Sequence, residues 1–115
     1  MAAGTLDFTI EQGATFNLLL TWEINNVAVN LTGYTARLAA RVDVEDTEVI
    51  LSMTTVNGAI TLGGVLGTIS LNQTATQTTL LAPGTYVYDL ELIASNATVT
   101  RLVQGELLIS AEVTR

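Results

Sequence analysis

Two carboxylates that lie two residues apart, Asp89 and Glu91, resemble the acid and base of a glycosidase more than any other pair in this sequence. They belong to a segment of alternating apolar and polar residues, so a strand would present both on one face. No second strand offers an obvious acid/base partner in a concave pocket. Pairing with Arg37 or Arg41 on the outer face of a neighbouring strand is the simpler interpretation. We therefore predict an ion-paired row and no catalytic residues.

The residue types that are missing support this prediction. The chain contains neither histidine nor cysteine. Histidine is the commonest general base and metal ligand, and cysteine supplies thiolate nucleophiles, thiolate metal sites and disulfides. We therefore predict a protein that is not an enzyme, with no cofactor and no small-molecule substrate.

An acidic segment is the main candidate for a metal site. Asp43, Glu45, Asp46 and Glu48 lie close together in sequence, and such loops bind calcium in some extracellular β-sandwiches. The segment lacks the ligand spacing and the glycine of an EF-hand loop, which favours a solvated hairpin loop. The sequence predicts no metal ligands here, although it leaves calcium binding by this loop open.

The larger aromatic residues raise a third possibility, a platform for sugars. Trp22, Tyr34, Tyr86 and Tyr88 are its candidates, but each is in phase with leucines or isoleucines of its own segment. Side chains in phase with an apolar face pack in a core, where a tyrosine hydroxyl finds one partner. We therefore predict that these four residues are core residues.

The composition of the chain excludes further classes of function. The chain has 115 residues and a formal net charge of −7, and its four basic residues are all arginine. A negative surface repels phosphate backbones and anionic lipids, so we expect no binding of nucleic acid or membranes. No apolar run reaches the ~18–20 residues that span a bilayer, and the N-terminus does not resemble a signal peptide. We predict one domain over 1–115, with tails at 1–5 and 111–115.

Period-2 alternation dominates the sequence and predicts a protein made of strands. The clearest segments are 14–24, with Phe16, Leu18, Leu20, Trp22 and Ile24 on one side, and 85–93 after a Pro83-Gly84 turn. Residues 34–42 also alternate, although their alanines would permit a helix. The full set of expected strands is 6–10, 14–24, 27–29, 34–42, 49–54, 59–62, 65–71, 85–93 and 98–110.

Turn residues separate these strands. Asn-Gly and Asn-Asn pairs favour the left-handed conformations of tight hairpins, and a glycine within a strand often marks a bulge. The expected turns are hairpins at 25–26 and 57–58, a glycine turn at 63–64 and a bulge at Gly105. One or two helical turns are expected near 73–80, where alternation stops, as a crossing from one sheet to the other. The sequence therefore predicts an all-β, two-sheet antiparallel sandwich of immunoglobulin-like size with about seven to nine strands.

Three segments carry a family resemblance. They are residues 8–16 (FTIEQGATF), 29–37 (VNLTGYTAR) and 84–92 (GTYVYDLEL). The chain resembles small virion proteins of tailed bacteriophages, in particular the immunoglobulin-like β-sandwich at the N-terminus of phage baseplate upper proteins. In those domains an L-T-G-Y turn and a G-x-Y-x-Y-D-L-x-L strand recur. The resemblance covers residues 6–109.

The resemblance implies a non-enzymatic structural or adaptor subunit of the tail, baseplate, neck or fibre attachment. It also implies that the protein contacts other virion proteins in several symmetric copies and is assembled in the host cytoplasm. The baseplate upper proteins continue into stem and receptor-binding-protein attachment regions that this sequence lacks, so its place in the virion stays open. The alternative is a carbohydrate-binding or adhesin-type sandwich that takes part in host recognition.

Overall fold

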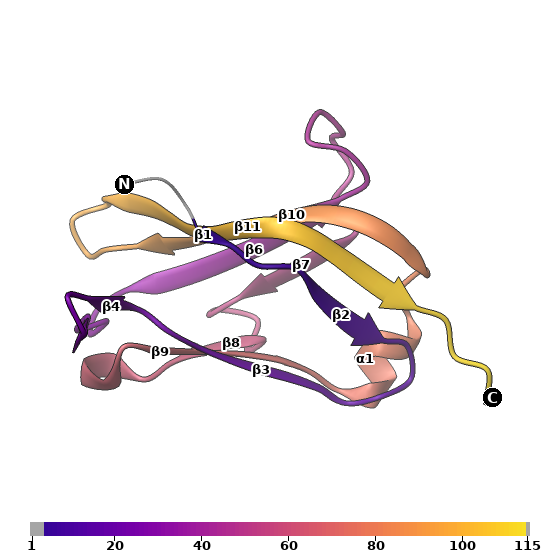
Figure 1. Ribbon diagram of the computed structural model, residues 1–115, viewed down its shortest axis with the longest axis horizontal. Helices are drawn as coiled ribbons and strands as arrows, with labels where there is room; N and C mark the ends of the chain where they lie inside the picture. The colour runs from indigo at the N-terminus through magenta and orange to yellow at the C-terminus, as the bar shows by residue number, and fades with distance from the viewer. Residues whose placement is uncertain (1–3, 115) are drawn as a thin grey trace.

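The structure, a computed structural model, describes residues 4–114, and the alternating segments form two β-sheets packed face to face (Figure 1). The larger sheet has six strands, with β10 at its centre between β6 and β11. Its members are β1 (Gly4–Thr5), β2 (Phe8–Glu11), β6 (Thr35–Arg41), β7 (Leu51–Thr54), β10 (Gly84–Ile93) and β11 (Val99–Ser110).

The smaller sheet contains three antiparallel strands in the order β3-β9-β8 and forms the lower layer in Figure 1. These strands are β3 (Phe16–Thr21), β9 (Thr68–Gln73) and β8 (Ile60–Leu62). A separate hairpin, β4 (Glu23–Ile24) and β5 (Val27–Ala28), extends the end of β3. Both residues of its turn, Asn25 and Asn26, have the predicted positive φ, at 53° and 66°.

The strand order is that of an immunoglobulin-type sandwich. In that fold, strands B, E and D form one sheet, and strands C, F and G form the other. Here β3, β9 and β8 take the places of B, E and D, and β6, β10 and β11 those of C, F and G. Tyr86 at the start of β10 donates its hydroxyl proton to the carbonyl of Ala82 at 2.6 Å, which reproduces the tyrosine corner of such domains. The predicted fold class is confirmed.

The N-terminal strands make the larger sheet mixed, where the sequence predicted antiparallel pairing throughout. Both β1 and β2 pair with β11 in parallel, and residues 6 and 7 separate them. Because Gly4 and Thr5 are paired in β1, the predicted tail at 1–5 is wrong for these two residues, while residues 1–3 lie outside the described part. Residues 111–114 have no regular structure, as expected of the other tail.

The crossing between the sheets contains the predicted helical turn. Helix α1 (Ala75–Thr79) links β9 to β10. Thr74 caps it, because its hydroxyl accepts from the amide of Gln77 while the Gln77 side chain accepts from the amide of Thr74. A second helical turn, the 3-10 helix η1 (Gly64–Leu66), was not predicted, and it replaces the start of the strand expected at 65–71.

Two turn predictions are wrong. Asn57-Gly58 does not close a hairpin, because β7 pairs with β6 while β8 pairs with β9 in the other sheet. The Asn57 side chain instead accepts from the amides of Thr54 and Ala59, and so stabilises a crossing. The bulge of β11 lies at Leu102, where the register with β10 shifts, and not at Gly105.

Gly105 has a different structural role, which is close approach of the backbone. A Cβ there would lie 2.3 Å from the carbonyl oxygen of Leu6, in the segment that separates β1 from β2. Only glycine leaves room for that segment to pack against β11.

The core lies between the sheets and contains the predicted face of β10. Leu90 and Leu92 are fully buried, and Tyr86 and Tyr88 are buried almost completely. Ala36, Leu38 and Ala40 of the neighbouring strand β6 are buried beside them on the same face of the sheet. This pattern confirms a strand and not a helix at 34–42. The remaining buried apolar residues are Ile10, Leu31, Leu51, Met53, Ala59, Ile60, Ile69, Leu71, Leu81, Leu107 and Ile109. No helix in the described range is long and apolar enough to cross a membrane.

Candidate functional site

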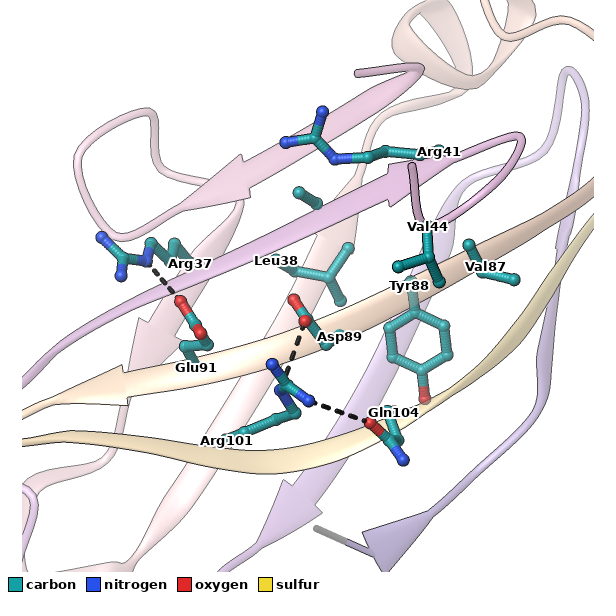
Figure 2. Close-up of a pocket in the computed structure, with 11 residues that line it drawn as sticks. Arg37, Leu38, Arg41, Val44, Val87, Tyr88, Asp89, Glu91, Arg101 and Gln104 are labelled. Atoms are coloured by element: carbon teal, nitrogen blue, oxygen red, sulfur yellow. Dashed lines mark hydrogen bonds and ion pairs between the residues drawn. The ribbon is translucent and has the colours of Figure 1, made fainter. Parts of the chain in front are cut away.

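The outer face of the larger sheet carries a groove of about 430 Å³ (Figure 2). Its floor is formed by β6, β10 and β11, and Val44 of the acidic 43–48 loop lies over one end. Ala39 of β6, between Arg37 and Arg41 in the sequence, contributes a short side chain to this lining. All three arginines that the structure describes, Arg37, Arg41 and Arg101, line the groove. This groove is therefore the one described surface where positive charge gathers.

Both carboxylates of the groove pair with arginines. Glu91 lies directly opposite Arg37 in the ladder, and its Oε1 accepts from Arg37 Nε at 2.7 Å. Asp89 Oδ2 lies 3.4 Å from Nε of Arg101 on β11, the other neighbour of β10. The predicted pairing with β6 is thus confirmed for Glu91. For Asp89 it is wrong, because the bulge at Leu102 places Arg101 within its reach.

Arg41 has a structural function and makes no ion pair with a carboxylate among the described residues. Its Nη1 donates to the carbonyls of Asp46 and Thr47 at 2.9 and 3.0 Å. These bonds hold the base of the 43–48 loop against β6. Within residues 4–114, no group of three or more acidic side chains is arranged to hold a metal ion, so the geometry gives no support to a calcium site in this loop.

Tyr88 is the titratable group beneath this face, and its phenol stays protonated near neutral pH. Its hydroxyl donates to the carbonyl of Leu6, and its ring packs edge-on against Phe8 at 4.9 Å between centroids. Burial, with a smaller contribution from the negative charge of Asp7, raises the pKa of Tyr88 to about 12. A phenol with so high a pKa stays protonated and is a poor acid or base catalyst. The groove can therefore recognise polar groups, but it holds no activated nucleophile.

The four large aromatic residues do not assemble a sugar platform on the surface, in agreement with the predicted core position. Tyr86 and Tyr88 are buried, and Trp22 and Tyr34 are half-buried against each other, edge to face, with 6.3 Å between ring centroids. The prediction that these four residues belong to the core is confirmed, with Trp22 and Tyr34 at its margin.

A second, smaller groove of about 300 Å³ lies over the smaller sheet near the start of α1. Its lining is rich in side-chain amides and hydroxyls and contains no aromatic residue. The residues that line it are Thr15, Asn17, Asn57, Gly58, Ala59, Asn72, Gln73, Thr74 and Gln77.

An apolar tip at one end of the sandwich, formed by Ile24, Val27, Val65 and Leu66, was missed by the sequence analysis. Ile24 and Val27 project from the β4–β5 hairpin, and Val65 and Leu66 from η1, with exposed fractions between 46% and 67%. The two loops adjoin, because the amides of Trp22 and Leu31 donate to the carbonyls of Gly67 and Gly64, each at 2.8 Å. The glycines around η1 were a usable signal, but they were interpreted as a simple turn.

Comparisons with known proteins add little to this geometry. No protein-family model matches the chain. No curated protein matches it either. Among solved structures, the crystal structure of CopC from Methylosinus trichosporium OB3b aligns with a TM-score of 0.47 and 9% identity, over 100% of this chain and 90% of that one.

Proposed function

We propose that this protein is a structural or adaptor subunit of a tailed-bacteriophage particle, in its tail, baseplate, neck or fibre attachment. It acts by protein–protein contacts and performs no catalysis. Its partners are other virion proteins, and it works in several symmetric copies. The sequence resemblance supports the phage context, and the contact surfaces described above support the mode of action.

The observation that carries the proposal is the apolar tip. Four large aliphatic side chains are exposed there on two loops that backbone hydrogen bonds hold together. Exposed apolar groups that gather on ordered backbone are typical of surfaces that another protein covers. The groove of the larger sheet, in contrast, has both of its carboxylates paired with arginines. The tip is therefore the surface that we assign to a neighbouring virion subunit.

The net charge of the protein indicates which kind of partner surface it can approach. Because the chain has a net charge of −7, a neutral or basic partner surface approaches it most easily. Such an interaction weakens as salt screens the attraction. Binding that does not respond to salt would argue against a basic partner.

Purified particles test the proposal. We expect the chain to co-sediment with particles from cells that carry its gene, at a fixed ratio to the major structural proteins in quantitative mass spectrometry. Replacing two tip residues together, Val27→Ser and Leu66→Ser, should lower this ratio while the isolated variant stays folded. Val56→Ser removes an exposed aliphatic side chain outside the tip and serves as the control. Complete particles that lack the chain would refute the proposal.

The amide-lined groove favours a second candidate, a carbohydrate-binding or adhesin-type module. Amides such as those of Asn17, Asn72 and Gln77 donate and accept hydrogen bonds, as sugar hydroxyls require. A glycan array with the native chain and with Asn72→Ala separates the two functions. Trp22→Ala would be an unsuitable variant for this array, because Trp22 packs against Tyr34 and its loss would destabilise the domain.

A further inference from the structure

The smaller sheet ends in an open edge along β3. Residues 16–21 pair with β9 on one side, and no strand of the described chain pairs with the other side. The amide of Trp22 donates to Gly67, which sets the alternation of the ladder. The backbone groups of Phe16, Leu18 and Leu20 therefore face β9. Those of Asn17, Leu19 and Thr21 point away from the sheet, where nothing in the described structure accepts them.

This edge differs from the other edges of the molecule. At the margin of the larger sheet, β1 and β2 are separated by residues 6–7, which include Asp7, and β2 ends at Glu11. The other edge strands, β7 and β8, contain only four and three residues. β3 is uninterrupted over six residues and has no charge and no proline. Natural edges usually carry such features because they block pairing with another chain, so β3 is the edge best able to accept a strand.

The side chains around this edge have a twofold pattern. Centred on Leu19, the sequence reads Phe-Asn-Leu-Leu-Leu-Thr-Trp from residue 16 to residue 22. Positions equally far from Leu19 match in chemical type: leucine with leucine, asparagine with threonine, and phenylalanine with tryptophan. An antiparallel pair of two such strands with Leu19 at the centre therefore places like beside like on both faces.

The burial of β3 also indicates a missing neighbour. Its inward side chains Phe16, Leu18 and Leu20 are only half-buried, whereas Ile69 and Leu71 of the adjacent β9 are buried almost completely. Leu19 on the outer face is 64% exposed. A strand placed beside β3 would cover the lateral sides of these four residues and would satisfy the free amides and carbonyls.

We propose that β3 pairs with β3 of a second copy of this chain, antiparallel, across a twofold axis at Leu19. In this register Asn17 lies opposite Thr21 of the second copy, and Leu18 opposite its Leu20. The twofold sequence pattern favours a second copy over an unrelated strand, because an isologous contact requires a self-complementary surface. The proposal stands on this edge alone and does not rest on the phage function.

The charge of the protein determines how this contact responds to salt. Each copy carries a net charge of −7, so two copies repel each other at long range. The uncharged edge is where they can meet without like charges opposite one another. Added salt screens the repulsion, so the dimer should tighten as salt rises. Binding to a basic partner would show the opposite dependence, which keeps the two proposals separable.

Single cysteines test the register, because the native chain contains none. Opposed residues of a hydrogen-bonded antiparallel pair lie about 5.5 Å apart at Cα, within the range of a disulfide. Leu19→Cys should therefore form a covalent dimer quickly under mild oxidation. Asn17→Cys and Thr21→Cys should each fail alone, since two copies of the same residue would lie roughly 13 Å apart along the strand. A mixture of these two variants should cross-link.

Sedimentation of the unmodified chain completes the test. We expect a dimer that dissociates on dilution, and Leu19→Lys should make it monomeric because it places two ammonium groups at the axis. Leu108→Lys is the matched control: Leu108 is an exposed leucine on β11, which has a strand on both sides. A native chain that is monomeric at all concentrations would overturn the proposal. Cross-linking of Asn17→Cys or Thr21→Cys alone, as fast as that of Leu19→Cys, would overturn the register.

Discussion

Two strand edges lie close together on one side of the sandwich, and they differ in length, continuity and charge. The first is formed by β1 and β2, and the second by β3; Phe8 of β2 stacks on Phe16 of β3 with 5.5 Å between centroids. Along the first edge, Tyr88 donates to the Leu6 carbonyl and Asp7 accepts from the amide of Glu106 at 2.9 Å. Along β3, the backbone groups of three residues have no partner in the described chain. These contacts hold the interrupted first edge against β11, whereas β3 presents six uninterrupted and uncharged residues, so β3 is the better of the two edges for accepting another strand.

Gly105→Ala should have the largest effect on the edge formed by β1 and β2. The added Cβ would meet the carbonyl of Leu6, a backbone atom that cannot yield without displacing the segment between β1 and β2. We expect a loss of about 1–3 kcal/mol in the free energy of unfolding, as for other overpacked sites, measured by urea denaturation. The variant should also expose the side of β11 that β1 and β2 cover, and form species larger than a dimer.

The matched control for that prediction is Gly4→Ala. A Cβ at Gly4 would make only ordinary contacts, the nearest at 3.6 Å. If both variants were equally stable, the close approach at Gly105 would not be what holds β1 and β2 against β11.

Alkaline pH should lower the free energy of unfolding through Tyr88, which contacts the same edge, by less than Gly105→Ala does. Tyr88 has a pKa of about 12 in the folded protein, above its ordinary value of 10.0. Between these values the unfolded chain has lost the phenolic proton while the folded chain retains it, so stability falls as pH rises from about 10 through 12. Unfolding measured over this range should show the decline, and Tyr88→Phe should flatten it. An unchanged decline in Tyr88→Phe would assign the effect to another group.

The smallest effect is expected at the ion pair on the outer face. Arg37 and Glu91 meet at 2.7 Å, but the arginine side chain is 57% exposed. A double-mutant cycle with Arg37→Gln and Glu91→Gln should give a coupling of about 0.2–1 kcal/mol that decreases with salt. The same variants should leave self-association unchanged, because this face lies away from β3. If these variants abolished the dimer, the dimer interface would have to lie at the groove and not along β3.

Much of the fold could be predicted from the alternation of apolar and polar residues. The errors arose where local sequence does not specify which strands become neighbours. The core seam of β10 was predicted correctly, because period-2 spacing places Tyr86 and Leu90 on one face wherever the strand lies. Asn57-Gly58 was misinterpreted because a local turn signal does not say whether the next strand returns beside the last or crosses to the other sheet. The glycines around η1 indicated a turn but not its helical form, and backbone hydrogen bonds from Trp22 and Leu31 hold this turn in place.

The candidate sites divide in the same way. The pairing of Glu91 with Arg37 was predictable, because two charged rows on outward faces need only be neighbours. The pairing of Asp89 with Arg101 was not, since it depends on a bulge that shifts the register of β11 by one residue. The apolar tip was missed because Ile24 continued the alternation of the preceding strand, although the hairpin takes it beyond the core.

What the sequence determined by itself was the kind of structure: an acidic all-β sandwich without histidine or cysteine, its strands set by an alternation that depends only on backbone geometry. The tertiary structure decided which strands lie at the edges of the sheets and which edge is long and uninterrupted. Asn17, Leu19 and Thr21 are ordinary outward residues in the sequence, and only the order β3-β9-β8 leaves their backbone groups unpaired. The physical reason is that hydrogen bonding between strands is a property of neighbours in space, which no single segment specifies.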